Sequence, residues 1–303
     1  MRQEAWQDLM PGNWQNVFPG CDDQGCGGIR RMWRRLWSRH SWIKLQGACY
    51  CADECFEKAV IPCFDRARTP AVSTKPIQHR IPLGLLLLSR GLLTNSQLRT
   101  ALEAQRTRGH GRIGEWLESL GFVTEQQITV ALGVQWRCPV LQPSAVADPH
   151  CARMLPLRLL QSFRMLPIQF VASTRVFYLA FSDGLDYTAL YAIEQMLHCR
   201  TEACLMSRSR LEQSLERIAH QPRQGDLHFE GWRAPKEMAR ITCDYVLKLG
   251  AEEVRIVGCG EYIWARLESG SDFSNLLFRC PVPELDKPVA SPKLSIASPG
   301  IPA

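Results

Sequence analysis

The sequence predicts an α+β protein of several domains, in which two helical hairpins precede two small segments that mix helices with strands. Three observations indicate this fold class. Residues 83–105 and 113–135 repeat nearly the same phrase, thirty residues apart, with the spacing of apolar residues that is typical of helices. After residue 137 the pattern changes to short apolar strands that alternate with helices. Residues 1–66 are instead rich in Trp, Arg and Cys.

The length and composition are sufficient for domains with hydrophobic cores of their own, since 46% of the 303 residues are hydrophobic and 22% are charged. A net charge of +6 permits an anionic ligand, and we expect no nucleic-acid partner. The chain does not open on a secretory signal, and its longest apolar run, LGLLLL, is too short to cross a bilayer. We therefore expect a cytoplasmic protein without a transmembrane segment, whose thirteen cysteines are reduced or bind metal.

Composition divides the chain into six parts. They are a Cys-rich segment (1–66), a linker (67–78), the tandem repeat (79–136), an α/β subdomain (137–222), a further small α/β segment (229–281) and a disordered tail rich in Pro, Ser and Ala (282–303). In the α/β subdomain the order helix, strand, strand, helix, strand, helix predicts a small sheet covered by helices, with the first helix broken at Pro156. The further segment predicts a helix followed by three strands.

Each copy of the tandem repeat predicts two helices joined by a tight turn. Gly91 and Gly121 are placed to end the first helix of each copy. Thr94 and Thr124 are placed to begin the second helix, and each is followed three residues later by Gln, which is the capping-box pattern. The repeat is therefore expected to form two helical hairpins.

Three repeated features point to a ligand. Gly84 and Gly114 lie in the first turn of a helix, where Gly costs about 1 kcal/mol relative to Ala but lets another group approach the backbone. The amides of a first turn have no intrahelical partner and suit a phosphate. Gln105 and Gln135 carry amides that can pair with a nucleobase edge, and Arg112 can hold a guanine edge or a phosphate. The alternative is that the hairpins are packing units only.

The repeated pattern resembles the tandem motif of the MshEN domain, the N-terminal domain of type II secretion and type IV pilus assembly ATPases of the GspE/PilB class. The resemblance implies binding of cyclic di-GMP, a dinucleotide with two equivalent halves. The ligand-binding positions that it implies are Leu83, Gly84, Gly91, Leu98, Leu102, Gln105, Arg112, Ile113, Gly114, Gly121, Ile128, Leu132 and Gln135. In the first copy Pro82 stands where the motif begins with Arg, with Arg80 two residues earlier, so the second copy is the better-preserved half. The resemblance continues through the α/β subdomain.

An ATPase of this class needs the phosphate-binding loop G-x4-G-K-[ST], and the sequence contains no match to that pattern. Its seven His are scattered and form no recognisable catalytic signature. We therefore expect a non-catalytic protein that binds cyclic di-GMP and passes that state to secretion or pilus assembly proteins. The alternative is a protein–protein adaptor of such a system that binds no nucleotide.

The Cys-rich segment contains two Cys pairs about 25 residues apart that could supply a tetrahedral Cys₄ zinc site. The ligands would be Cys21, Cys26, Cys51 and Cys55. A bound zinc ion would stabilise a segment that has little core of its own. Cys49 and Cys63 are alternative ligands, and the competing hypothesis is a set of reduced cysteines in a loosely ordered segment.

Overall fold

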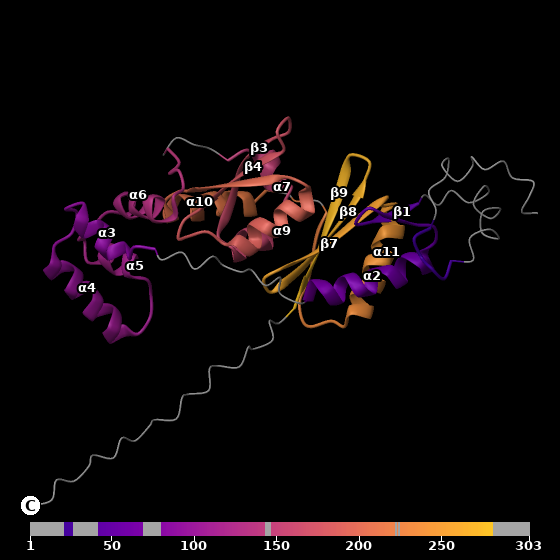
Figure 1. The fold of residues 1–303 in the computed structure, drawn as a ribbon, viewed down its shortest axis with the longest axis horizontal. Coiled ribbons are helices and arrows are strands. Elements are labelled where there is room, and N and C mark those ends of the chain that lie inside the picture. Colours follow the sequence, from indigo (N-terminus) through magenta and orange to yellow (C-terminus); the bar gives the residue numbers. More distant parts are fainter. Residues whose placement is uncertain are drawn as a thin grey trace, which may run out of the picture.

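The computed structural model describes residues 21–26, 42–68, 80–142, 147–221, 223 and 225–280. These residues form three parts in a row: the tandem repeat, a three-stranded α/β subdomain and a six-stranded sheet with its helices (Figure 1). The predicted α+β multidomain fold class is confirmed. The tail 282–303 and nearly all of the predicted linker lie outside the described residues. Among the described helices, none is long and apolar enough to span a membrane.

The tandem repeat forms four helices, as predicted. They are α3 (Leu83–Ser89), α4 (Asn95–Arg108), α5 (Ile113–Ser119) and α6 (Glu125–Trp136). Thr94 and Thr124 each accept a hydrogen bond from the backbone amide three residues on, and both capping boxes are complete. Gly91 and Gly121 follow the first helix of each copy with φ angles of 67° and 70°, a left-handed conformation that Gly adopts without strain.

The helices of each hairpin of the repeat pack on helices of the other hairpin. Helix α4 packs on α5, α6 packs on α3, and α3 meets α5 between them. The amide Nε2 of Gln105 donates to the carbonyl of Gly111 over 2.8 Å, and that of Gln135 donates to the carbonyl of Ile81 over 2.7 Å. Gly111 and Ile81 are also thirty residues apart, so the two bonds are equivalent under the repeat. The repeat therefore closes on itself around a shared apolar core.

The α/β subdomain has the predicted element order, with the first helix broken at Pro156. Its elements are α7 (Pro149–Arg153), α8 (Leu157–Ser162), β3 (Met165–Val171), β4 (Val176–Phe181), α9 (Tyr187–Leu197), β5 (Arg200–Leu205) and α10 (Arg208–Ala219). Strand β3 is antiparallel to β4, and β4 is parallel to β5. Because the carboxyl ends of parallel neighbours meet at one edge of a sheet, the loops that follow β4 and β5 lie together.

The third part joins both ends of the described chain in one six-stranded sheet. Its elements are β1 (Ile43–Leu45), β2 (Ala48–Tyr50), α2 (Asp53–Arg68), β6 (Asp226–Phe229), α11 (Pro235–Leu249), β7 (Glu253–Cys259), β8 (Tyr262–Ser269) and β9 (Asp272–Arg279). The strand order is β2-β1-β7-β8-β9-β6. Helices α2 and α11 pack together on one face, while residues of the other face, such as Trp264 and Leu277, enter the core of the α/β subdomain.

This sheet corrects the predicted division into a separate Cys-rich segment and a separate small α/β segment. Strand β1 pairs in parallel with β7, and Phe56 and Phe64 of α2 are buried in the core that β7, β8 and β9 share. Two three-residue strands and one helix cannot bury a core alone, so they complete the distant sheet instead. The segment also begins earlier than predicted, since β6 starts at Asp226.

Gly258 of β7 lies against the last turn of α2. A methyl group on its Cα would overlap the carbonyl oxygen of Ala67. We therefore expect Gly258→Ala to lower the free energy of unfolding by about 1–3 kcal/mol, the usual cost of overpacking, in urea denaturation followed by circular dichroism. Gly25→Ala is the control, because its methyl would lie 3.6 Å from the Asp23 carboxylate. Equal stability of the two variants would contradict the packing of α2 on β7.

Candidate ligand-binding site

A cavity of about 660 Å³ lies between the tandem repeat and the α/β subdomain. Its walls come from the starts of α5 and α10, from α6 and from the loops that follow α8 and β4. The volume falls within the range of about 300–1,000 Å³ that is typical of small-molecule pockets. The cavity opens at the carboxyl edge of β4 and β5, where the topology brings two loops together.

Seven of the thirteen predicted ligand-binding residues line this cavity. They are Leu83, Arg112, Ile113, Gly114, Ile128, Leu132 and Gln135. All except Leu83 come from the second copy of the repeat or from the residue directly before it. The other six do not line it: Gly84, Gly91, Leu98, Leu102, Gln105 and Gly121.

The repeated glycines have different surroundings. Gly84 is buried against its own hairpin, since an added Cβ would lie 2.8 Å from Cδ1 of Leu98. Gly84 therefore allows α3 and α4 to approach closely. Gly114 also packs against apolar side chains, with 3.4 Å from an added Cβ to both Ile128 and Leu83, but it lies in the wall of the cavity. The first-turn glycine thus lines the cavity in the second copy only.

The two repeated glutamines each form a hydrogen bond between the two copies of the repeat, and their predicted pairing with a nucleobase stays a prediction. Their Nε2 atoms donate to the backbone carbonyls of Gly111 and Ile81. Those donors are engaged inside the repeat. Gln135 still lines the cavity, whereas Gln105 does not.

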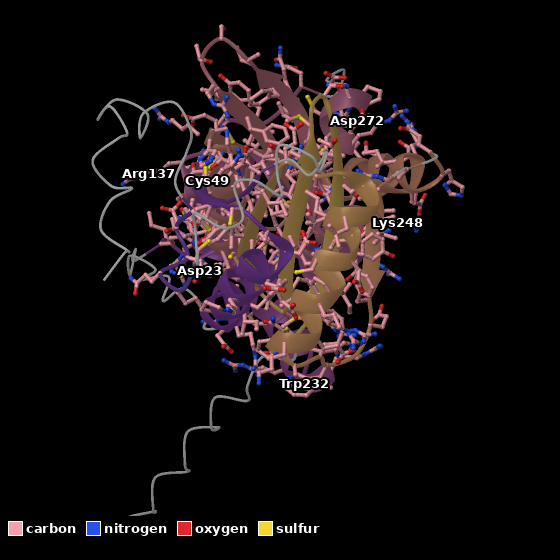
Figure 2. All side chains as sticks on the ribbon, turned by 90° about the vertical axis from the view of Figure 1, so that its right-hand side faces the viewer. Asp23, Cys49, Arg137, Trp232, Lys248 and Asp272 are labelled. Atoms are coloured by element: carbon pink, nitrogen blue, oxygen red, sulfur yellow. The ribbon has the colours of Figure 1, made fainter. Side chains whose placement is uncertain are left out.

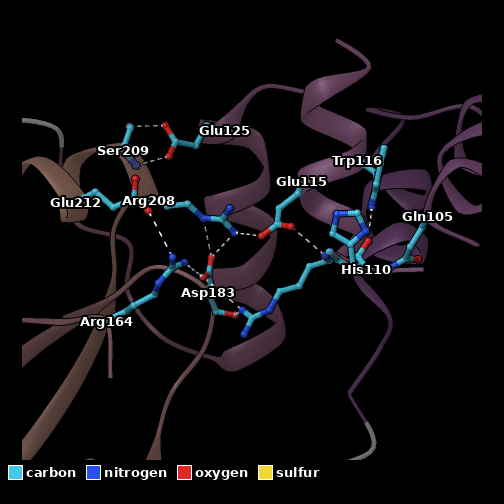
Figure 3. Close-up of polar contacts among 12 residues, drawn as sticks. Gln105, His110, Glu115, Trp116, Glu125, Arg164, Asp183, Arg208, Ser209 and Glu212 are labelled. Atoms are coloured by element: carbon cyan, nitrogen blue, oxygen red, sulfur yellow. Dashed lines mark hydrogen bonds and ion pairs between the residues drawn. The ribbon is translucent and has the colours of Figure 1, made fainter. Parts of the chain in front are cut away.

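Asp183, in the loop after β4, binds three arginines (Figure 3). Its Oδ1 lies 2.9 Å from Nη2 of Arg208, and its Oδ2 lies 3.3 Å from Nη1 of Arg164 and 3.5 Å from Nη1 of Arg112. The Asp183 side chain is 17% exposed, whereas that of Arg112 is 64% exposed. Because Arg112 belongs to the repeat and the other two arginines to the α/β subdomain, this carboxylate joins the two parts.

Two glutamates of the repeat strengthen the same junction. Glu115 accepts a hydrogen bond from the backbone amide of Arg112, and its Oε1 lies 2.8 Å from Arg208. These contacts lower the pKa of Glu115, although burial acts in the opposite direction. Burial disfavours the charge of Arg208, but its bonds to Asp183 and Glu115 outweigh burial and raise its pKa. Glu125 accepts both the amide and the hydroxyl of Ser209, over 2.7 and 2.6 Å.

An aromatic and partly apolar wall faces the charged groups. Trp136 lies in this wall, and the guanidinium of Arg80 stacks on its ring, 3.3 Å from the ring centroid. An added Cβ on Gly184 would clash with the same ring, so the absence of a side chain there lets the indole reach the loop after β4. Ser182 is 4% exposed, and its hydroxyl has no hydrogen-bond partner among the described residues.

The sequence prediction missed Glu115, Trp136, Arg164, Asp183 and Arg208. A topological signal for three of them was present. Asp183 follows β4, and Arg208 is the first residue of the helix after β5, so the parallel pairing of these strands places both at one edge. Arg164 directly precedes β3, and the antiparallel pairing of β3 with β4 places it at the same edge. Glu115 and Trp136 carry no such signal, because they reach the cavity through the placement of the repeat on the α/β subdomain.

The four predicted zinc ligands come together at a second place. The Sγ atoms of Cys21, Cys26, Cys51 and Cys55 all lie within 4.8 Å of one another. All thirteen cysteines are described and none forms a disulfide. The two alternative ligands do not join the group, and the Sγ of one of them, Cys63, donates to the carbonyl of Ala59 over 3.4 Å.

Part of the chain is similar to known proteins. The MshEN domain family matches residues 136–225, which begin at the last residue of α6 and cover the α/β subdomain. The type IV pilus assembly ATPase PilB of Thermus thermophilus is 29% identical over 115 residues. That match spans 38% of this chain and 13% of the length of PilB.

Two solved structures are also similar. A structure of MshE with cdg is 30% identical, with 46% of this chain and 99% of that chain covered and a TM-score of 0.40. A structure of the N-terminal domain of XpsE is 21% identical, with 45% and 92% covered and a TM-score of 0.33.

The depressed pKa of Glu115 predicts a pH-dependent stability. Such a carboxylate contributes stability above the pKa of the unfolded chain, and that contribution is lost as the pH falls through the folded-state pKa. Glu115→Gln should therefore lower the Tm at pH 7, and the difference from the wild type should close as the pH falls below the ordinary value of 4.5. Glu118→Gln, on the exposed side of the same helix, is the control. A difference in Tm that stays constant down to pH 3 would contradict the assigned contacts.

Proposed function

We propose that this chain, whose residues 136–225 match the MshEN domain family, is a non-catalytic protein that binds cyclic di-GMP in the cavity between its tandem repeat and its α/β subdomain. One observation carries the proposal. Three arginines and the first turn of the second repeat copy converge on one cavity that also has an aromatic wall.

The arginines suit the phosphates of this ligand. Arg112, Arg164 and Arg208 all lie within 3.5 Å of Asp183, so their guanidinium groups are already gathered around an anionic group. A phosphate oxygen is a strong acceptor for such groups and can form paired hydrogen bonds with one guanidinium. A phosphate of the ligand would thus take over contacts that the Asp183 carboxylate makes in its absence.

The remaining lining favours a ligand that brings hydrogen-bond donors as well as phosphates. Five carboxylates line the cavity against three arginines, and they belong to Glu115, Glu118, Glu125, Asp183 and Asp186. This excess of negative charge disfavours a highly charged ligand such as ATP. Guanine offers N–H donors that suit carboxylates, and its O6 and N7 atoms suit arginine.

The aromatic and apolar wall suits the planar faces of the bases. Trp136 offers an indole ring on which the Arg80 guanidinium stacks, and a base would either take the place of that guanidinium or use the other face. Stacking of a base on an aromatic side chain contributes about 1–3 kcal/mol. Ile113 and Ile128 add apolar surface beside Gly114, which also lines the cavity. The resemblance of the tandem repeat to a cyclic di-GMP motif supports the same ligand.

Binding at this place would also alter the junction between the two parts of the molecule. The ion pairs of Asp183 with Arg112, and of Glu115 with Arg208, connect the repeat to the α/β subdomain. A phosphate that competes for these arginines would weaken the junction, and a partner that senses the position of the repeat could read this change. PilB is a type IV pilus assembly ATPase, and we propose secretion or pilus assembly proteins as the partners. The matched residues span 13% of the length of PilB, and no ATPase activity is proposed for this chain.

Isothermal titration calorimetry on the full chain tests the ligand. We expect cyclic di-GMP to bind with a micromolar dissociation constant, and GMP and ATP to bind at least tenfold more weakly, because neither presents two guanines and two phosphodiesters together. An absence of heat with cyclic di-GMP at high micromolar concentration would contradict the proposal. That result would favour an adaptor that binds no nucleotide.

Variants of two arginines test the place of binding. Arg112→Ala should weaken cyclic di-GMP binding about 10- to 100-fold, because a hydrogen bond to a charged group contributes about 1.5–3 kcal/mol. Arg106→Ala is the matched control, since Arg106 is exposed on α4 and does not line the cavity. Folding of both variants is checked by circular dichroism. Equal affinity of the two variants would show that the ligand binds elsewhere.

A further inference from the structure

Four cysteines from separate stretches of the chain converge at one edge of the six-stranded sheet. Cys21 and Cys26 lie in a loop before β1, Cys51 directly follows β2, and Cys55 lies in the first turn of α2. The Sγ atoms of Cys26 and Cys51 are 3.3 Å apart, and those of Cys51 and Cys55 are 4.0 Å apart. All four sulfur atoms lie within 4.8 Å of one another.

These distances match metal ligands and do not match disulfides. A disulfide requires about 2.05 Å between sulfur atoms. Tetrahedral zinc with zinc–sulfur bonds of about 2.3 Å requires about 3.8 Å between neighbouring sulfur atoms. The two measured sulfur–sulfur distances, 3.3 and 4.0 Å, lie on either side of this spacing of about 3.8 Å. Small adjustments of the side chains around an ion would therefore complete the coordination.

Backbone hydrogen bonds hold the loop of Cys21 and Cys26 in place. The amide of Cys49 donates to the Asp22 carboxylate over 2.6 Å, and the amide of Asp22 donates to the carbonyl of Cys49 over 3.0 Å. A turn at Asp23 is closed by the amides of Gly25 and Cys26. Figure 2 shows Asp23 and Cys49 on neighbouring stretches of this edge. The loop is therefore shaped to present two thiols toward Cys51 and Cys55.

The other nine cysteines provide an internal comparison. All of them are described, and they take part in no group of three or more potential metal ligands. The buried thiol of Cys204 donates to the backbone carbonyl of Leu179 over 3.3 Å, as an isolated core cysteine does. Convergence of four thiols is thus specific to this edge of the sheet.

We infer that Cys21, Cys26, Cys51 and Cys55 bind one structural zinc ion that fastens the loop of residues 21–26 to the edge strand β2. Four thiolates fill every position of a tetrahedral ion, and a closed site of this kind is structural. Residues 21–26 add no side chain to the hydrophobic clusters, so little apolar burial holds them. The ion would also cover β2, which is the last strand of the sheet and would otherwise leave an open edge.

The test is metal analysis of the full chain by inductively coupled plasma mass spectrometry, after expression in medium that contains both zinc and iron. We expect one zinc per chain and four thiols protected from alkylation until a chelator removes the metal. Chelation should lower the Tm, because an ion that binds only the folded chain stabilises it. Iron in place of zinc would overturn the choice of ion, since four thiolates also suit iron.

Single substitutions locate the site. Cys26→Ser and Cys51→Ser should each lower the zinc content of the purified chain at least tenfold. Cys49→Ser is the matched control, because Cys49 is a neighbouring cysteine of the same edge outside the group. Cys26→Ser lies in a loop outside the core, so circular dichroism should show that the chain still folds. A folded wild-type chain without metal, or full zinc content in both Cys26→Ser and Cys51→Ser, would overturn the inference.

Discussion

The arrangement of the site depends on one carboxylate, Asp183, that binds three arginines from separate segments of the chain. It gathers the guanidinium groups of Arg112, Arg164 and Arg208 at one place, although the side chains of Arg112 and Arg164 are more than half exposed. Through Arg112, Asp183 connects the tandem repeat to the α/β subdomain. The contacts of Glu115 and Glu125 support the same junction. The cavity is the space left beside this junction. The contacts that hold the two parts together are therefore the contacts that an anionic ligand would compete for.

The features that sequence could predict are those decided by near neighbours in the chain. The capping boxes at Thr94 and Thr124 depend on a Gln three residues away, and the turns at Gly91 and Gly121 depend on one backbone conformation. The helix and strand order of the α/β subdomain follows from local periodicity. The four clustered cysteines were also predicted, because two Cys pairs about 25 residues apart have a spacing that suits one tetrahedral ion.

The features that sequence could not predict depend on contacts between distant segments. The repeated Gln residues were predicted to pair with a base, and their amides donate to the loops that precede each copy. These hydrogen bonds join the two copies, so the sequence of a single copy does not reveal them. The pairing of β1 with β7 joins stretches that composition had assigned to different domains. Glu115 and Trp136 reach the cavity only once the repeat is placed on the α/β subdomain. Gly84 and Gly114 occupy equivalent positions, yet only one faces the cavity, because the α/β subdomain covers one half of the repeat.

Hydrogen–deuterium exchange of the full chain, with and without cyclic di-GMP, can show whether this ligand binds in the cavity beside Asp183, because it locates the ligand without any substitution. Our account predicts slower exchange at the start of α5 and in the loop after β4, the two stretches that meet at Asp183. It predicts no change in α2 and α11, which pack on the opposite face of the six-stranded sheet. Protection confined to α4, or an unchanged exchange pattern at a saturating concentration of the ligand, would contradict the account.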